Sequence, residues 1–120
     1  MSFLTAFNKQ IENFIGELHD LYPQDLDIGM AKNTIYLLKK ANPKKLFTIF
    51  KTYITPFEQQ ILKKNEDFFL KRDYNDIHGG VESSLDTVMN LKKYWATMTE
   101  STKNNIWLYL QVLIKLSNKI

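Results

Sequence analysis

The sequence of 120 residues contains no cysteine, only four glycines and only three prolines. Without cysteine it forms neither a disulfide nor a thiolate metal site, and it offers no cysteine nucleophile, which fits a reducing compartment. No apolar run approaches the roughly 20 residues that span a membrane. The start, Met1-Ser2-Phe3-Leu4, lacks the basic and apolar regions of a signal peptide. We therefore expect a soluble intracellular protein without a membrane span.

Motifs with a chemical function are also missing. The glycines fit neither nucleotide-binding spacing, and the serine elbow of hydrolases does not occur. The two histidines, His19 and His78, have no partner at metal-ligand spacing. The acidic residues do not follow the pattern of a calcium-binding loop. These absences predict a protein that is not an enzyme and that has no cofactor and no metal site.

Arginine is scarce, because only one of the sixteen basic residues, Arg72, is an arginine. Bidentate recognition of phosphate or guanine favours arginine, so its scarcity argues against sequence-specific nucleic-acid binding. The formal net charge of +3 is unevenly distributed: residues 1–31 carry net −4, residues 32–64 net +7 and residues 65–120 net 0. The second quarter of the chain is therefore the basic one.

Helical periodicity is the strongest pattern that is present. Between Phe3 and Tyr22, apolar residues recur every three or four positions, which places them on one face of a helix. No segment alternates with the period of two that is typical of a half-buried strand. We predict an all-α fold, with residues 1–120 as a single helical domain, a compact bundle of five to seven helices.

Proline marks the end of the first predicted helix, because Pro23 disfavours the helical conformation at Tyr22. Asp25 or Asp27 then caps a second helix that runs to about Ala41. The residues predicted to face inward from this second helix are Leu26, Met30, Leu37, Leu38 and Ala41.

Two more helix starts contain proline. Asn42 is the predicted N-cap and Pro43 the first residue of a third helix that runs to Ile54. Thr55 and Glu58 then have the spacing of a capping box, with proline between them, which predicts a fourth helix. A short turn or helix at residues 68–70 follows it.

Adjacent glycines, Gly79 and Gly80, favour a loop over residues 73–80. A further helix is predicted from about Val81 to Met98. Thr99 or Ser101 is the expected cap of the last helix.

The last helix is the most apolar, since nine of the eleven residues 106–116 are apolar. Such a helix is expected to be buried and central. Its polar residues form a thin stripe that also includes Trp107, so this tryptophan is either a partly exposed anchor for a protein partner or a core residue. Phe69 is the second aromatic candidate for protein binding. The polar residues of the stripe are Asn104, Gln111, Lys115 and Asn118.

Five lysines lie around the junction of the second and third predicted helices, and we call them the lysine corner. They offer two interpretations: a solvated face that keeps the domain soluble, or a weak, salt-sensitive and sequence-independent site for polyanions. The lysine corner consists of Lys39, Lys40, Lys44, Lys45 and Lys51.

Several phrases of the sequence occur together: Phe14-Ile15-Gly16-Glu17-Leu18, Lys40-Ala41-Asn42-Pro43, Glu66-Asp67-Phe68-Phe69-Leu70, Tyr94-Trp95, and Ile106-Trp107-Leu108-Tyr109-Leu110-Gln111. In these segments the chain resembles small helical proteins of large nucleocytoplasmic DNA viruses, the mimivirus and phycodnavirus-like groups. Lysine, asparagine and isoleucine make up 36 residues, which agrees with an A/T-rich genome. The resemblance implies a viral origin and a place in the host-cell cytoplasm or the virion. It brings no activity, cofactor or binding residue.

The absence of chemical motifs and the sixteen aromatic residues together favour a small protein–protein interaction or adaptor module. Such a module would contact its protein partner through Trp107 and Phe69. The alternative is non-specific binding of nucleic acid or another anionic surface through the lysine corner. Neither the partner nor the oligomeric state follows from the sequence.

Overall fold

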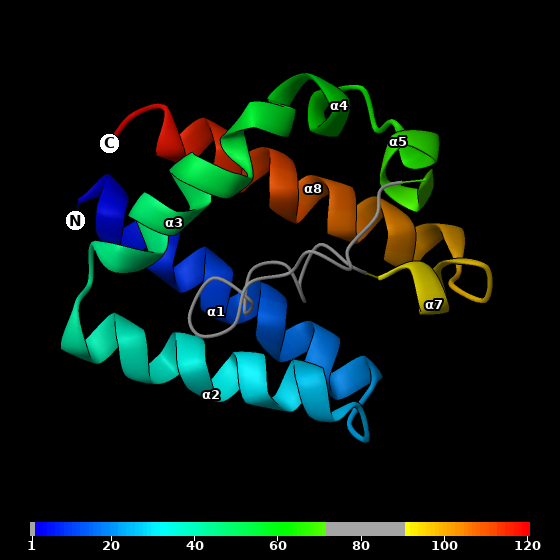
Figure 1. Ribbon diagram of the computed structural model, residues 1–120, viewed down its shortest axis with the longest axis horizontal. Helices are drawn as coiled ribbons and strands as arrows, with labels where there is room; N and C mark the ends of the chain where they lie inside the picture. The colour runs from blue at the N-terminus through cyan, green and yellow to red at the C-terminus, as the bar shows by residue number, and fades with distance from the viewer. Residues whose placement is uncertain (1, 72–90) are drawn as a thin grey trace.

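The computed structural model describes residues 2–71 and 91–120, and all regular structure in these two stretches is helical. This confirms the all-α prediction. The described residues form seven α-helices and one 3-10 helix, shown in Figure 1. The elements are α1 (Phe3–Leu21), α2 (Leu26–Ala41), α3 (Lys45–Tyr53), η1 (Thr55–Phe57), α4 (Glu58–Leu62), α5 (Glu66–Lys71), α7 (Lys92–Trp95) and α8 (Glu100–Ser117).

Short polar side chains cap the three longest helices, because the first amide groups of a helix have no acceptor within it. Ser2 accepts from the amide of Thr5 at the start of α1. Asp25 accepts from the amide of Ile28 in α2, which confirms one of the two predicted caps. Thr99 caps α8, also as predicted.

The predicted start of the third helix is wrong by two residues, because α3 begins at Lys45. Asn42 ends α2 instead, since its amide still donates to the carbonyl of Leu38, 2.7 Å away. Pro43 lies in the joint and accepts a hydrogen bond of 2.8 Å from Nδ2 of the buried Asn8 in α1. The joint is thus attached to α1.

The predicted capping box at Thr55 is also wrong. Ile54 keeps a helical backbone conformation, so the chain passes from α3 into η1 without the extended residue that an N-cap needs. Thr55 Oγ1 is buried and has no hydrogen-bond partner among the described residues. Glu58 accepts instead from Nδ2 of Asn118, the residue that follows α8. The short helix predicted around residues 68–70 is confirmed as α5.

Only a portion of the loop and helix predicted over residues 73–98 falls within the described residues. The glycine loop, 73–80, and residues 81–90 of the next predicted helix lie outside the described residues. The remainder of that helix is reduced to the single turn α7. Leu91, which directly precedes α7, and Trp95 within it are buried.

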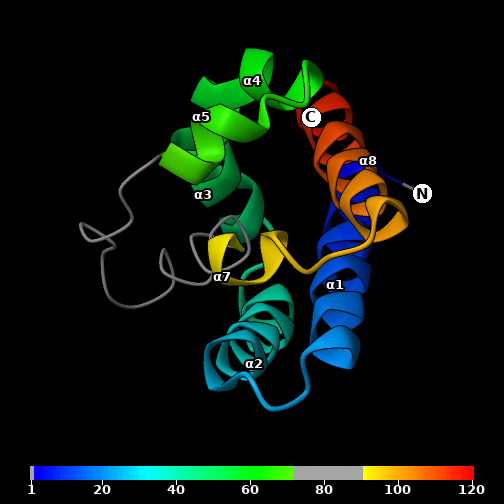
Figure 2. The ribbon, with the colours of Figure 1, turned by 90° about the vertical axis from the view of Figure 1, so that its right-hand side faces the viewer.

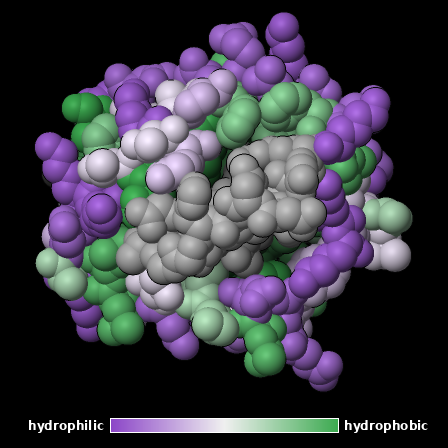
Figure 3. Space-filling view, in the orientation of Figure 1, coloured by the Kyte–Doolittle hydropathy of each residue, from purple (hydrophilic) through white to green (hydrophobic). Residues whose placement is uncertain are grey.

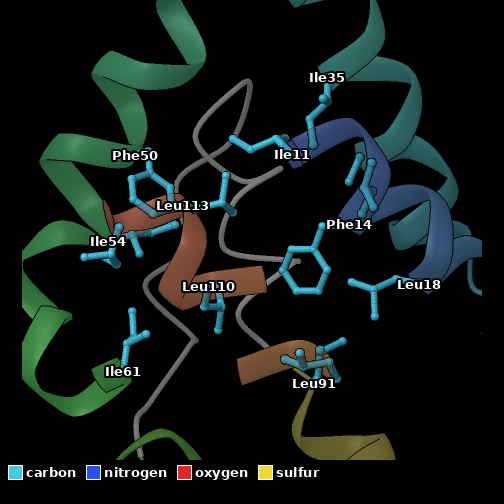
Figure 4. Packing of buried hydrophobic residues seen from close by; sticks show 14 of the residues in the cluster. Ile11, Phe14, Leu18, Ile35, Phe50, Ile54, Ile61, Leu91, Leu110 and Leu113 are labelled. Atoms are coloured by element: carbon cyan, nitrogen blue, oxygen red, sulfur yellow. The ribbon is translucent and has the colours of Figure 1, made fainter. Parts of the chain in front are cut away.

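Helix α1 lies between α2 and α8 and contacts both of them as well as α3 (Figures 1 and 2). The short helix α4 packs on α8. Buried side chains from all of these helices point into one shared interior, as Figure 4 shows for Ile11, Phe14, Ile35, Phe50 and Leu113. Helix α8 is buried along one side, while Asn104, Lys115 and Asn118 are exposed as the polar stripe predicts.

Candidate functional site

Trp107 and Phe69 lie in the core rather than at an exposed edge. Trp107 is 5% exposed and Phe69 is 9% exposed. The ring of Trp107 lies 5.7 Å from that of Phe69 in α5 and 5.8 Å from that of Trp95 in α7. Of the two alternatives for Trp107, the structure shows the core residue and not the partly exposed anchor, because rings from two other helices pack against it.

The polar stripe of α8 holds neighbouring helices in place. Gln111 donates to the carbonyl of Ile61 in α4, 3.3 Å away. Asn118 donates to Glu58 and accepts from Lys51 in α3. Gln111 and Asn118 therefore have a structural role, whereas Asn104 and Lys115 of the same stripe are exposed.

The lysine corner does not form one uninterrupted basic face. Lys39 pairs with Glu12 of α1, and Lys51 donates to Asn118 at the far end of α3. Lys40 lies over the ring of Tyr36, 4.4 Å from its centroid. Of the five lysines, Lys40 and Lys44 are exposed at the α2–α3 joint, and Lys45 is half-buried there.

The side of α2 that faces the core is opposite to the side that the sequence predicted. Its buried residues are Ile28, Ala31 and Ile35. Leu26 and Leu37, predicted to face inward, are instead 81% and 64% exposed. Met30 and Ala41 were also predicted to face inward but are exposed. Leu38 packs against the core, as predicted.

The sequence carried a signal for this orientation, but an ambiguous one. Ile28, Ala31, Ile35 and Leu38 are spaced three and four apart, so they form an apolar stripe as regular as the predicted one. Two stripes on one helix leave open which of them faces the core. Packing on α1 and α3 settles this, and Leu26, Met30 and Leu37 of the second stripe remain exposed. Along the lower edge of Figure 3, where α2 lies, hydrophobic groups alternate with hydrophilic ones.

Asp25 is the centre of a polar cluster that joins α7 to the start of α2. Its carboxylate accepts from the hydroxyl of Tyr94, pairs with Lys93 at 2.8 Å and caps α2 through Ile28. The ring of Tyr94 stacks on Tyr22, with centroids 3.7 Å apart. Asp25 and Tyr94 are 69 residues apart, so the sequence identified the cap but not the cluster.

The cluster is suited to holding α7 against the start of α2 and not to proton transfer. Burial alone would raise the pKa of Asp25, but hydrogen bonds from Lys93 and Tyr94 outweigh burial and lower this pKa to about 2. The hydrogen bond to Asp25 raises the pKa of Tyr94, and burial adds to that rise. A carboxylate with so low a pKa is a poor general base near neutral pH.

Two hollows among the described residues lie against α8. An apolar cavity of about 40 Å³ lies among α5, α7 and α8, lined by Phe69, Trp95 and Trp107; it is large enough for little more than a few water molecules. A groove of about 360 Å³ lies between α1 and α8. There Tyr109 donates to Glu17 at 2.8 Å, and burial together with this bond raises the pKa of Tyr109 to about 12.

Within residues 2–71 and 91–120, no group of three or more His, Asp or Glu side chains is arranged to hold a metal ion. No helix described there is both long and apolar enough to cross a membrane. Comparison of the chain with protein-family models, with curated proteins and with solved structures finds no match.

Proposed function

We propose that the protein is a small protein–protein interaction module, an adaptor without catalytic activity, that binds its partner through the outer face of α2. The observation that carries this proposal is the exposure of Leu26, Met30 and Leu37 along one side of a 16-residue helix. Exposed apolar residues are ordinary when they are single. Several in a row on one helix are typical of a helix-binding surface.

Trp107 and Phe69 are no longer the residues expected to touch the partner. Both rings are buried, so a partner would reach them only if α5 or α7 moved away. Their replacement would change the core as well as any interface. The outer face of α2 replaces them as the binding surface.

Partner capture with matched variants tests the proposal. Leu37→Asp places a charge on the outer face of α2, and Leu108→Asp does the same on α8, where Leu108 is similarly exposed at 59%. We expect proteins captured from host-cell lysate by the immobilised wild type to fall at least tenfold with Leu37→Asp and to stay unchanged with Leu108→Asp. Equal capture by both variants would remove α2 as the binding surface.

The proposed setting follows from the resemblance of the sequence to proteins of large nucleocytoplasmic DNA viruses. It places such a module in the host-cell cytoplasm or in the virion. Mass spectrometry of purified virions and of infected-cell cytoplasm distinguishes these two locations. Absence of the protein from both would contradict a viral role.

A second candidate function is weak polyanion binding at the lysine corner, which the exposure of Lys40 and Lys44 favours. Such binding weakens steeply as salt rises, because it releases counterions. Titration of an oligonucleotide at two salt concentrations measures it. Replacement of Lys40 and Lys44 by glutamate is expected to weaken binding at low salt, and unchanged binding would dismiss this candidate.

A further inference from the structure

The outer face of α2 is a single line of side chains along the helix. Leu26, Met30, Asn33 and Leu37 follow one another at intervals of four, three and four residues and are all exposed, which places them on one side. Helix α2 lies at the edge of the molecule, against α1 and α3 (Figures 1 and 2). As far as the described residues show, the outer side of α2, which is about 24 Å long, is open to another helix at these four positions.

The two ends of this line carry opposite charges. Residues 20–27, at the N-terminal end, contain three aspartates and no basic residue. Residues 39–45, at the C-terminal end, contain four lysines and no acidic residue. Asp25 and Lys39 are already paired with Lys93 and Glu12, whereas Asp27 and Lys40 are exposed.

These charges distinguish between the two ways in which a second α2 could lie on the first. A parallel copy would place aspartate against aspartate and lysine against lysine, which is unfavourable. An antiparallel copy places the aspartate-bearing end of each helix beside the lysine-bearing end of the other, Met30 opposite Leu37, and the two copies of Asn33 near each other. The antiparallel arrangement has a two-fold axis and closes as a dimer, the commonest symmetry of oligomers.

We propose that the occupant of this face is a second copy of the chain, its α2 lying antiparallel about a two-fold axis near Asn33. The inference names the partner of the surface on which the proposed protein-binding function rests. One face of a 16-residue helix offers less than the roughly 800 Å² per partner of a stable complex. The dimer is accordingly weak, with a dissociation constant in the micromolar range or above.

Sedimentation velocity across a wide concentration range measures the self-association. We expect the wild type to shift from monomer to dimer as concentration rises, and Leu37→Asp to raise the dissociation constant at least tenfold. Leu108→Asp, the matched change on α8, is expected to leave it unchanged, with far-UV circular dichroism confirming that both variants are folded. A wild type that stays monomeric throughout, or equal effects of the two changes, overturns the proposal.

Disulfide trapping tests the antiparallel register, since the chain has no cysteine of its own. Asn33→Cys is expected to form a cross-linked dimer on oxidation. Met30→Cys alone is expected to cross-link poorly, because its two copies would lie about 10 Å apart along the helix, while the double variant Met30→Cys, Leu37→Cys cross-links efficiently. Leu108→Cys gives the rate of random collision. Cross-linking of Met30→Cys as fast as Asn33→Cys overturns the antiparallel register.

The outcomes also separate this inference from the function on which it rests. A monomeric chain whose capture of another protein is lost with Leu37→Asp overturns self-association and leaves the protein-binding function intact. A dimer that dissociates with Leu37→Asp while no other protein is captured supports self-association and removes the need for a different partner.

Discussion

Asp25 is the side chain at which two distant parts of the chain meet. It caps α2, and it binds Lys93 and Tyr94 beside the stacked ring of Tyr22. Its side chain is only 4% exposed. A carboxylate so placed stabilises the fold only while it is ionised, because its hydrogen-bond donors cannot be satisfied equally by the neutral acid.

We expect this cluster to make the free energy of unfolding depend on pH in the acidic range. The pKa of Asp25 is about 2 in the folded protein against an ordinary 3.8, so the unfolded chain takes up a proton first as pH falls. The stabilisation, about 2 kcal/mol, is complete well above pH 4 and is lost as pH falls through about 2.

Urea unfolding between pH 6 and pH 2 measures this loss for the wild type and for Asp25→Asn. Asparagine caps helices as well as aspartate does, so the variant keeps the bond to Ile28 and removes the charge. The wild type should be the more stable protein at pH 6, and the difference should shrink toward pH 2. A difference that does not change with pH would show that the charge on Asp25 is not what stabilises the cluster.

Trp107 and Leu108 are neighbours in α8 that lie in opposite environments, at 5% and 59% exposure. Trp107→Ala leaves a cavity among Phe69 and Trp95, and we expect it to lower the free energy of unfolding by about 3–5 kcal/mol. Leu108→Ala should change it by no more than about 0.5 kcal/mol. Denaturant unfolding of the two variants gives both numbers, and similar losses would contradict the burial of Trp107.

At the scale of elements, the helix ends show which local signals decide structure. Ser2, Asp25 and Thr99 cap their helices as a short polar residue ahead of an apolar helix predicts. Thr55 stands in an equally favourable sequence yet does not cap, because α3 continues into η1 and leaves no extended residue at the joint. A capping pattern therefore acts only where the preceding chain is free to leave the helical conformation.

This difference predicts opposite results for two threonine replacements. Thr99→Ala removes the acceptor of the Thr102 amide and should cost about 1 kcal/mol of stability. Thr55→Val removes a buried hydroxyl without a hydrogen-bond partner among the described residues, and it should leave stability unchanged or raise it. Thermal unfolding compares the two variants. A loss at Thr55 as large as that at Thr99 would restore the capping box.

At the scale of the whole molecule, one cluster of buried residues includes side chains from α1, α2, α3, α4, α5, α7 and α8. The aromatic contacts of Trp95 and Trp107 join α5, α7 and α8 within this cluster. That residues 1–120 form a single domain remains a prediction, and this shared core supports it.

The shared core predicts one cooperative unfolding transition. Tryptophan fluorescence reports on the α5–α7–α8 region, while far-UV circular dichroism reports on all helices. The two transitions should coincide in urea. Fluorescence that changes at a lower urea concentration than circular dichroism would show that this region unfolds separately, and would contradict a single cooperative unit.

The sequence by itself determined what depends on neighbours along the chain: the all-α class, the end of α1 near Pro23, and the presence of a cap at Asp25 or Asp27 and at Thr99 or Ser101. These follow from periodicity and from hydrogen bonds within one turn. The tertiary structure decided which of two apolar stripes on α2 is buried, that Trp107 is covered, and that Asp25 meets Lys93 and Tyr94. Each of these depends on contacts between residues far apart in sequence. The surface now expected to carry function, the outer face of α2, exists because α1 and α3 bury the other side of that helix.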